Sequence, residues 1–227
     1  MSASDLLRIV VLTGAGISAE SGLKTFRASD GLWEDHRIED VATPEGFQKD
    51  RELVHRFYNQ RRRQLQDQAV QPNPAHKALA ELGVSEGVHL TLVTQNIDNL
   101  HERAGSENLY HMHGELLQVL CFSCGEVSVF EDDVTGTSRC PACGALGCLR
   151  PNIVWFGEMP FFMDEISGLV ARADLFVAIG TSGVVYPAAG LVSMTSPSCK
   201  TVLLNQETTD NAPAFEDQVL GPASQIV

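Results

Sequence analysis

The segment 8–18, which reads RIVVLTGAGIS, joins an apolar, β-branched run to a glycine-rich turn. An apolar run of this length without polar alternation is typical of a central strand in a parallel sheet, which is covered on both faces. Three further runs have the same character, at 89–93, 175–179 and 201–204. Helical patterns lie between the runs, at 73–82, 98–104, 164–173 and 187–194. Strands that alternate with helices predict an α/β fold built on a doubly wound parallel sheet.

The charge balance excludes one broad class of partner. The 227 residues include 16 Lys and Arg against 29 Asp and Glu, which gives a formal net charge of −13. Such a charge repels phosphate backbones, so we expect no direct binding of nucleic acid. No apolar run approaches the roughly 18–20 residues that span a bilayer, and the apolar stretch 6–12 lacks the basic flank of a signal peptide. We therefore expect no membrane partner and a cytoplasmic location, where disulfides are rare.

Four of the six cysteines follow the spacing of a zinc site. Cys121 and Cys124 form one C-x2-C pair, Cys140 and Cys143 form a second, and 15 residues separate the pairs. Four thiolates complete a tetrahedral shell that leaves no position for water, so we predict one structural Zn²⁺. A redox pair or free buried thiols are the alternatives. The remaining two cysteines are expected to be core or surface thiols.

Two stretches interrupt the alternation of strands and helices. Residues 45–71, after Thr43 and Pro44, predict one or two charged helices, and residues 121–149 are rich in turns. We expect both stretches to form a smaller module beside the sheet. The expected domains are a main domain of residues 1–37, 84–116 and 157–227, a helical insertion of residues 38–83 and a zinc-binding insertion of residues 117–156.

Each apolar run ends in a polar cluster. The clusters are 13–19, 94–98, 180–183 and 205–207. In open α/β sheets a ligand binds outside the carboxyl ends of the strands, so four clusters at one edge predict a nucleotide site. The first cluster has the form G-x-G-x-x-A, in which glycine allows close backbone approach and a helix N-terminus offers N–H groups to a pyrophosphate. A tight βα turn is the alternative, and the lack of a second strand with a terminal acid about 20 residues later disfavours a plain dehydrogenase.

Two histidines lie in the segment 110–115, which reads YHMHGE. On an extended segment His111 and His113 would point the same way and could bind a metal, although the four cysteines already complete one metal shell. Next to a nucleotide site, His113 is the better candidate for a general base, because the ordinary pKa of imidazole lies near neutrality.

Several motifs, taken in order, carry a resemblance that covers nearly the whole chain. They are GAGIS at 14–18, TFR at 25–27, GLW at 31–33, TQNID at 94–98, HG at 113–114, the two cysteine pairs, VWFGE at 154–158, GTS at 180–182 and LN at 204–205. This set resembles the sirtuins, the NAD-dependent protein-lysine deacylases, and most closely the short bacterial-type enzymes. One departure is the end of the chain at Val227, where sirtuins usually continue into a final helix.

The resemblance implies a Rossmann-like domain that consumes NAD, releases nicotinamide and transfers an acyl group from a protein lysine to ADP-ribose. It implies that His113 is the general base, and that Asn96 and Asp98 hold the ribose and nicotinamide, with Asn96 also catalytic. Asp98 could equally be a helix N-cap. The other implied NAD contacts are Gly14, Ala15, Gly16, Ser18, Glu20, Phe26, Arg27, Trp33, Gln95, Ile97, Gly180, Thr181, Ser182, Asn205, Gln206, Glu207 and Ala223. An ADP-ribosyltransferase on the same site is the alternative activity, and a non-catalytic NAD-binding module is a third.

The resemblance also implies that acylated-lysine proteins are the substrates. Val154, Phe156, Gly157 and Glu158 would pair main-chain groups with an extended substrate peptide, as in β-augmentation. An internal strand is the alternative for this stretch, because a short apolar run does not reveal its partner.

A basic cluster in the helical insertion predicts the kind of acyl group. Tyr58 and Arg61 are three apart, so they share a helix face, and a planar guanidinium fits a carboxylate. A solvated helix face is the alternative. A sirtuin subgroup that removes succinyl and malonyl groups carries Tyr-x-x-Arg here with an alanine 16 residues earlier, which corresponds to Ala42. The resemblance therefore implies a desuccinylase and demalonylase that also removes acetyl groups, with room for the longer acyl chain beside Ala42.

Overall fold

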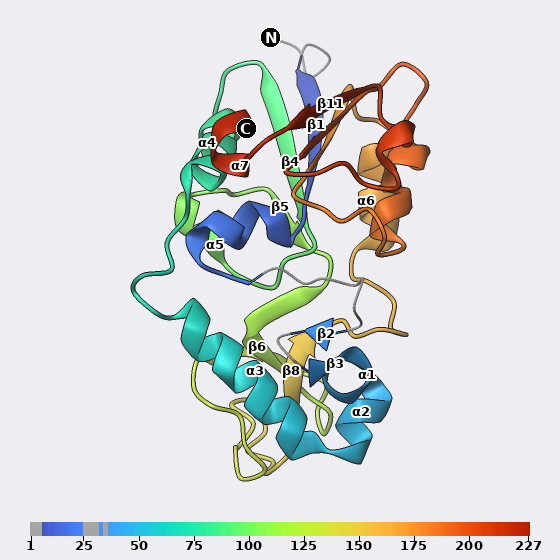
Figure 1. The fold of residues 1–227 in the computed structure, drawn as a ribbon. Coiled ribbons are helices and arrows are strands. Elements are labelled where there is room, and N and C mark those ends of the chain that lie inside the picture. The colour runs from blue at the N-terminus through green and yellow to red at the C-terminus, as the bar shows by residue number, and fades with distance from the viewer. Residues whose placement is uncertain (1–5, 25–31, 34–35) are drawn as a thin grey trace. The chain divides into compact units, whose positions relative to one another are not determined.

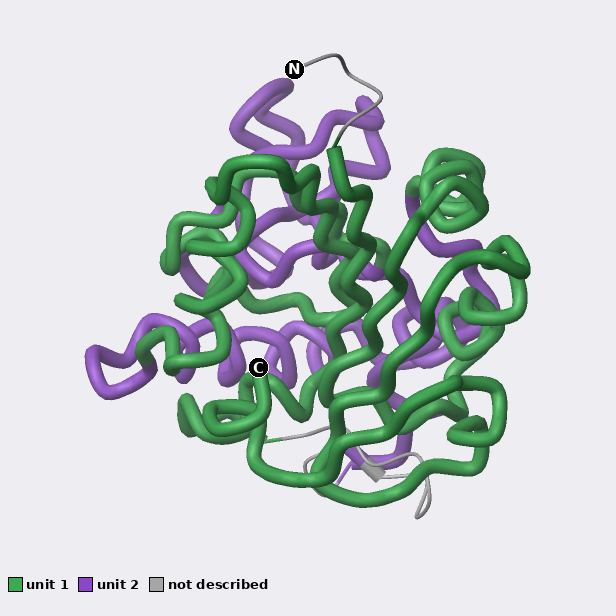
Figure 2. The backbone as a smooth tube through the Cα atoms, turned by 90° about the horizontal axis from the view of Figure 1, so that it is seen from above, with its two compact units in different colours: residues 1–25, 71–112, 162–227 green, residues 26–70, 113–161 purple. Residues whose placement is uncertain are grey.

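The computed structural model describes residues 6–24, 32–33 and 36–227. Two of the predicted site residues, Phe26 and Arg27, lie outside the described residues. The chain divides into two compact units, which Figure 2 colours separately. Unit 1 comprises residues 1–25, 71–112 and 162–227, and unit 2 comprises residues 26–70 and 113–161.

Within the described residues, unit 1 is built on a six-stranded sheet in which all neighbouring strands are parallel (Figure 1). In sheet order the strands are β11 (Asp217–Leu220), β10 (Lys200–Asn205), β9 (Leu175–Ile179), β1 (Leu7–Thr13), β4 (Val88–Thr94) and β5 (Leu109–His111). The four apolar runs of the sequence form the four central strands, so the predicted parallel sheet is confirmed. The sequence does not predict the edge strands, because β5 has three residues and all four residues of β11 are exposed.

Helices connect these strands. They are the 3-10 helices η1 (Ala15–Ser21), η3 (Ala188–Met194) and η4 (Ala212–Ala214), and the α-helices α4 (Pro74–Gly83), α5 (Leu100–Ala104), α6 (Met163–Val170) and α7 (Ala223–Ile226). The four predicted helices are present, although the one expected at 187–194 is a 3-10 helix. Asn73 caps α4, because its Oδ1 accepts a hydrogen bond from Ala75 N over 3.0 Å. None of the described helices is long and apolar enough to cross a membrane.

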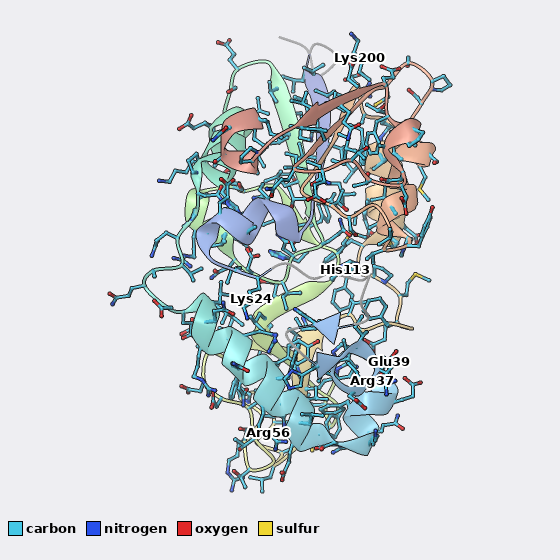
Figure 3. All side chains as sticks on the ribbon, viewed as in Figure 1. Lys24, Arg37, Glu39, Arg56, His113 and Lys200 are labelled. Atoms are coloured by element: carbon cyan, nitrogen blue, oxygen red, sulfur yellow. The ribbon has the colours of Figure 1, made fainter. Side chains whose placement is uncertain are left out.

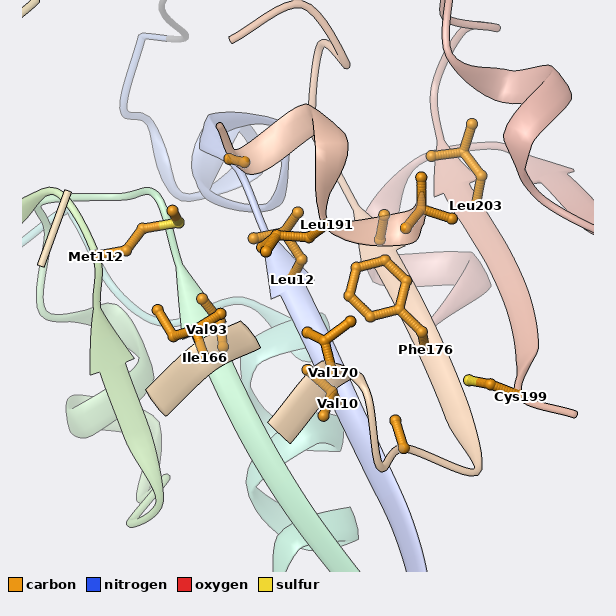
Figure 4. Packing of buried hydrophobic residues seen from close by; sticks show 14 residues of the cluster. Val10, Leu12, Val93, Met112, Ile166, Val170, Phe176, Leu191, Cys199 and Leu203 are labelled. Carbon is orange, nitrogen blue, oxygen red and sulfur yellow. The ribbon is translucent and has the colours of Figure 1, made fainter. Parts of the chain in front are cut away.

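The sheet carries a hydrophobic core on each face, because successive residues of β1 point to opposite sides. On one face Val10 and Leu12 belong to the same cluster as Phe176 of β9 (Figure 4). Ile166 of α6 and Leu191 of η3 complete this cluster. The cluster on the other face contains Ile9, Val11, Ile17, Ala75, Leu79, Leu90, Leu92, Ile179 and Ala223. Helices on both faces confirm that the sheet is doubly wound.

Unit 2 combines short helices with small antiparallel sheets. The helices are α1 (Ile38–Val41), α2 (Pro44–Lys49) and α3 (Arg51–Leu65). Strand β2 (Leu32–Trp33) pairs with β3 (His36–Arg37), and a second sheet has the order β7 (Val127–Val129), β6 (Gly114–Cys121) and β8 (Leu149–Ile153). Thr43 Oγ1 caps α2 by accepting from Gly46 N over 3.0 Å, and Asp50 Oδ1 caps α3 by accepting from Leu53 N over 2.8 Å. The charged stretch after Thr43 therefore folds as two helices.

The division into units differs from the expected domain boundaries. Helix α4 belongs to unit 1 and not to the helical insertion, because Ala75 and Leu79 pack in the same core as β4. Residues 32–37 belong to unit 2, where β2 and β3 lie. The zinc-binding part starts at 113 and not at 117, because β6 begins at Gly114 and pairs with β8.

The turns that follow β1 and β9 touch through their backbones. Gly14 N donates to Ile179 O over 2.9 Å. Gly16 N donates to Gly180 O over 2.8 Å. A Cβ atom on Gly14 or Gly16 would stand 2.7 Å from a backbone atom of Gly180. Gly180 itself has a φ of 62°, and a Cβ atom there would collide with Ile17 N. Each of the three positions therefore requires glycine.

We expect Gly16→Ala to lower the free energy of unfolding by about 1–3 kcal/mol, the usual cost of forcing extra volume into a packed site. Urea denaturation of wild type and variant measures this change. Gly83→Ala is the matched control in unit 1, because its Cβ would meet a Leu90 methyl group at 3.6 Å, an ordinary contact. The control should leave stability unchanged or raise it by up to about 1 kcal/mol. Equal stability of Gly16→Ala and wild type would contradict the backbone contact.

Candidate active site

The glycine-rich turn has another role than its pattern predicts. Gly14 N donates to Ile179 O at the end of β9, Gly16 N donates to Gly180 O in the turn after it, and Ile17 N donates to Gly14 O over 3.1 Å. These three N–H groups are therefore already bonded inside the protein, and the binding of a pyrophosphate at this turn stays a prediction. The close backbone approach expected of the glycines is present, but the partner is the protein's own backbone.

Polar side chains from three strand ends meet at this edge of the sheet. Gln95 Nε2 donates to Thr181 Oγ1 over 3.1 Å, and Asn205 Nδ2 donates to Thr181 O over 3.0 Å. Thr181 is buried, and the other two are half-buried. The structure thus brings together one residue from each cluster after β4, β9 and β10. Of the other predicted contacts at these strand ends, Ile97 is half-buried, and Ser182, Gln206 and Glu207 are exposed.

A buried carboxylate lies beside the glycine-rich turn. Ser18 Oγ donates to Asp98 Oδ2 over 3.0 Å. Asn96 Nδ2 donates to both Ser18 Oγ and Gly14 O over 3.2 Å. Asn96 and Asp98 are only 6% and 7% exposed. Burial raises the pKa of Asp98, and the hydrogen bonds from Leu100 N and Ser18 oppose that rise.

Asp98 has a second role at the start of α5. Its Oδ1 accepts from Leu100 N over 3.1 Å while its Oδ2 holds Ser18. One carboxylate therefore serves the helix start and the polar cluster at the same time. The N-cap residue of α5 is Asn99, so the expectation that Asp98 is the N-cap is wrong by one residue, although its carboxylate bonds to the first turn. Its contact with nicotinamide stays a prediction.

Two histidines extend the polar cluster into the core, and sequence reasoning missed both. His76 Nε2 lies 3.4 Å from Ser18 Oγ, and His101 Nε2 lies 3.0 Å from Thr13 Oγ1. The two ring centroids are 4.9 Å apart. Burial lowers the pKa of His76 to about 4 and that of His101 to about 3, so both rings are neutral at pH 7. Each histidine follows a helical pattern like an ordinary core residue, so the sequence gives no signal for the pair.

Two predicted NAD contacts have structural partners within unit 1. The carboxylate of Glu20 accepts from Ser224 N over 2.9 Å and from Ser224 Oγ over 2.7 Å. Ala223 is buried in the same core cluster as Ile17 of η1. Both residues therefore attach the short helix α7 to η1, a role that needs no ligand.

His111 and His113 do not lie on one extended segment. Strand β5 ends at His111, residues 112–113 form a turn, and β6 begins at Gly114. The expectation that the two rings point the same way along one strand is therefore wrong. Gly114 has a φ of 82°, and a Cβ there would collide with Asn152 O, so the motif needs its glycine. His113 is half-buried at the start of β6 (Figure 3), and its carbonyl accepts from Val154 N over 2.9 Å.

His111 supports the loop that carries Asn96. Its Nδ1 lies 3.1 Å from Asn96 O, and its Nε2 lies 2.6 Å from a carboxylate oxygen of Glu102. Both ring nitrogens of His111 are therefore engaged within unit 1. His111 is thus a structural residue of unit 1, whereas His113 belongs to unit 2.

The segment 154–158 is not a strand, because β8 ends at Ile153. The alternative of an internal strand is therefore wrong for these residues. Phe156 N donates to Ala42 O over 2.9 Å. The carboxylate of Glu158 accepts from Arg150 over 2.7 and 2.9 Å and from Trp155 N over 2.8 Å. Glu158 therefore closes its own loop, and the main-chain N–H groups of 154 and 156 are already used within unit 2.

The residues predicted to select the acyl group are buried together in unit 2. Tyr58 is 0% exposed and accepts at its hydroxyl from Trp155 Nε1 over 3.0 Å. Burial raises the pKa of Tyr58. Arg61 is 8% exposed, and its guanidinium stands 3.3 Å over the centroid of the Phe57 ring. The alternative of a solvated helix face is therefore wrong for this pair. Ala42 is buried as well.

Trp33, predicted to contact NAD, lies beside these residues within unit 2. Its ring centroid is 5.0 Å from that of Phe57 and 6.0 Å from that of Tyr58. The Arg61 guanidinium carbon lies 5.5 Å from the Trp33 centroid. Trp33 therefore forms one wall of an aromatic cluster around Arg61, a role that the spacing of the sequence does not reveal.

The four predicted zinc ligands converge. The sulfur atoms of Cys121, Cys124, Cys140 and Cys143 all lie within 4.8 Å of one another. The pairs Cys121–Cys143 and Cys124–Cys140 are both 3.9 Å apart. Tetrahedral Zn²⁺ with bonds of about 2.3 Å separates its sulfur ligands by about 3.8 Å, so the four thiols fit one zinc ion. Four protein ligands leave no open position, which is the mark of a structural site.

The parallel sheet with its polar carboxyl edge and the four-cysteine centre define a class: an α/β protein with a nucleotide-type site and a zinc module. The family model described as "SIR2: Sir2 family" matches residues 14–187, and the chain belongs to the Sir2 family. The sirtuin resemblance of the motifs is thereby confirmed.

Similar proteins align with almost the whole chain. The chain is 58% identical over 221 residues to the "NAD-dependent protein deacylase" of Escherichia coli K12, which covers 97% of this chain and 79% of that protein. It is 57% identical over 220 residues to the protein of the same description from Yersinia pestis, covering 96% and 79%.

Solved structures share the fold. A structure described as "Crystal structure of a Sir2 homolog-NAD complex" has a TM-score of 0.86 and 41% identity, over 96% of this chain and 85% of that one. Another, "Sir2 bound to acetylated peptide", has a TM-score of 0.80 and 33% identity, over 96% and 89%.

We expect purified protein to hold one zinc ion per chain, measured by elemental analysis. Removal of the metal by a chelator should expose the four thiols to a thiol reagent and lower the melting temperature, because metal binding and local folding are linked. Cys148→Ser is the control, because Cys148 lies outside the four-cysteine cluster and should leave the zinc content unchanged. Protein without zinc, with all four thiols open to titration, would contradict the site.

Proposed function

We propose that the chain is an NAD-dependent protein-lysine deacylase that transfers the acyl group to ADP-ribose, releases nicotinamide and accepts acidic as well as acetyl groups. The observation that carries the NAD part is the buried Ser18–Asn96–Asp98 cluster at the carboxyl edge of the sheet. The relatives described as NAD-dependent protein deacylases support the same activity. The acidic-acyl part depends on the buried pair Tyr58 and Arg61.

The polar cluster of unit 1 fits the nicotinamide half of NAD. A buried carboxylate such as Asp98 accepts hydrogen bonds from an amide. Asn96 offers its Oδ1 as an acceptor to a ribose hydroxyl, because its Nδ2 already donates to Ser18 Oγ and Gly14 O. Its neighbours His76 and His101 are neutral, so Asp98 is the ionisable group of this cluster that can carry charge. Thr181 and Asn205, at the ends of β9 and β10, would hold the adenosine half. When bound, NAD supplies the ribosyl bond that breaks and the hydroxyl that receives the acyl group.

His113 would act on that ribose hydroxyl. Its imidazole would accept the hydroxyl proton when the hydroxyl oxygen bonds to the acyl carbon, and it would give a proton to the lysine amine when the bond between the acyl carbon and the lysine nitrogen breaks. The positive φ of Gly114 fixes the backbone directly after His113, which limits the positions of the ring. The carbonyl of His113 is held by Val154 N, next to the segment proposed to bind the substrate peptide.

Arg61 and Tyr58 would select acidic acyl groups. A guanidinium surrounded by aromatic rings has lost much of its hydration, so a carboxylate that reaches it gains a strong, charge-assisted contact. Ala42 is small, and its carbonyl is bonded to Phe156 N, which keeps it beside the substrate segment. A larger side chain at 42 would occupy space that the longer acyl chain needs.

One experiment tests the activity directly. Purified protein is incubated with NAD and one peptide in acetyl-, succinyl- and malonyl-lysine forms, and products are read by mass spectrometry. The proposal requires nicotinamide and O-acyl-ADP-ribose together. Nicotinamide without O-acyl-ADP-ribose would indicate an ADP-ribosyltransferase or an NAD glycohydrolase. The cytoplasmic location and the absence of a nucleic-acid partner stay predictions from the sequence.

We expect His113→Ala to lower the turnover number by about 10²–10⁴-fold, the usual contribution of a general base. The affinity for NAD, measured by calorimetry, should stay close to that of wild type. His111→Ala is the matched control and should cost less turnover, because His111 supports a loop through Asn96 and Glu102. If His111→Ala is the inactive variant and His113→Ala keeps wild-type turnover, the assignment of the base is wrong.

We expect Arg61→Met and Tyr58→Phe to reduce desuccinylation far more than deacetylation. A hydrogen bond to a charged group contributes about 1.5–3 kcal/mol, which corresponds to roughly 10- to 150-fold in relative efficiency. The measurement is the ratio of kcat/KM for the succinyl and acetyl forms of one peptide. Arg56→Met is the control, because Arg56 is an exposed arginine of α3 that pairs with Glu52 of the same helix. An equal loss on both peptides after Arg61→Met would remove the acidic-acyl assignment and leave the deacylase activity standing.

A further inference from the structure

Helix α3 has a second contact face besides the one that carries Tyr58 and Arg61. This face carries His55, Asn59 and Arg62, with Gln66 at the C-cap. Their spacings of four, three and four residues place them in one stripe along a helix. Each of the four makes a hydrogen bond to main-chain atoms of the segment 113–161. Helix α3 is therefore held to the rest of unit 2 along its length.

Asn59 makes the most specific of these contacts. Its Nδ2 donates to Val134 O over 2.8 Å, and its Oδ1 accepts from Val134 N over 2.8 Å. One side-chain amide thus pairs with both main-chain groups of a single residue, as a neighbouring strand would. Arg62 Nη1 donates to the same Oδ1 over 2.8 Å, which fixes the orientation of the amide. Asn59 is 5% exposed, so water does not compete for these bonds.

Val134 connects Asn59 to the zinc centre. Its side chain is buried in the cluster that contains the zinc ligands Cys121 and Cys140. Three further contacts tie α3 to nearby parts of the same module: Gln66 Nε2 to Glu131 O over 2.8 Å, Arg63 to the carboxylate of Asp133, and His55 to Leu149 O over 3.1 Å. Helix α3 therefore packs against the zinc-binding part of unit 2, residues 113–161, which is called the zinc ribbon below.

The two faces of α3 move as one body. Asn59 directly follows Tyr58, and Arg62 directly follows Arg61, so a rotation of the helix about its axis displaces both pairs. With side chains reaching about 5–6 Å from the axis, a rotation of about 10° moves their ends by about 1 Å. A misplacement of about 1 Å at a group that contacts substrate is enough to cost about 100-fold in rate.

We propose that Asn59 is a positioning residue for acyl selection: its paired bonds to Val134 anchor α3 to the zinc ribbon and thereby set Tyr58 and Arg61. The preference for acidic acyl groups then depends on the ribbon, although no zinc ligand contacts the acyl group. This inference rests on the proposed function of Arg61 and deepens it.

The test is a double-mutant cycle on the succinyl-to-acetyl ratio of kcat/KM, with wild type, Asn59→Ala, Arg61→Met and the combination of both. We expect Asn59→Ala to lower kcat/KM for the succinyl peptide about 10-fold and for the acetyl peptide less than about 2-fold. The double variant should have the ratio of Arg61→Met alone, because Asn59 acts through Arg61. Zinc content and KM for NAD should match wild type.

Two further variants keep the test decisive. Gln60→Ala removes an exposed side-chain amide of α3 next to Asn59 and should leave the ratio unchanged. Asn59→Asp keeps the acceptor for Val134 N but loses the donor to Val134 O, so it should lower the ratio even if Asn59→Ala does not fold. An equal loss on both peptides, or an additive double variant, overturns the inference. If Arg61→Met itself leaves the ratio unchanged, the proposed acyl selectivity fails as well. If Arg61→Met lowers the succinyl-to-acetyl ratio but the Asn59 variants do not, only the positioning role of Asn59 fails.

Discussion

The backbone contact between the turns after β1 and β9 is the constraint on which the polar edge of unit 1 depends. Gly14 and Gly16 lie so close to Gly180 that no side chain fits between them. This contact holds the start of η1 against the sheet, and Ser18 follows two residues later. Ser18 can then donate to Asp98, and Asn96 can reach the carbonyl of Gly14. The hydrogen bonds of the Asp98 carboxylate thus depend on the three glycines at 14, 16 and 180.

Unit 2 buries two adjacent arginines, Arg61 and Arg62. Arg62 is fully buried, donates to Leu116 O and to Asn59, and has a pKa lowered by burial to about 10, so it remains charged at pH 7. Arg61 instead stacks on Phe57 and donates to the Phe57 carbonyl over 2.7 Å. The Arg62 guanidinium bonds to other parts of unit 2, whereas the Arg61 guanidinium faces aromatic rings. Arg61 and Arg62 therefore have different roles, because their side chains point to different faces of α3.

The sequence is most informative where the structural cause is local. The central strands are predictable because burial on both faces makes each an unbroken apolar run, and the zinc site is predictable because both cysteine pairs are short motifs. The pair His76 and His101 is not predictable, because its two members meet only after the sheet has formed. The aromatic contacts of Trp33 are not predictable for the same reason, since its partners lie in α3. The glycine pattern predicts a close approach, but no pattern says whether a ligand or the chain's own backbone approaches.

The position of β1 at the centre of the sheet also governs when the protein can fold during synthesis. β1 leaves the ribosome before β4 and β9, yet Thr13 bonds to Thr94, 81 residues later, and Arg8 bonds to Asp174, 166 residues later. At about 5–20 residues per second, the second side of β1 waits roughly 8–33 s for its neighbour, with an apolar edge open to other chains. The four cysteines of the zinc site lie between Cys121 and Cys143, so all of them are synthesised before Asp174. The ligands of the metal centre are therefore complete in the nascent chain while the second side of β1 still lacks its neighbour.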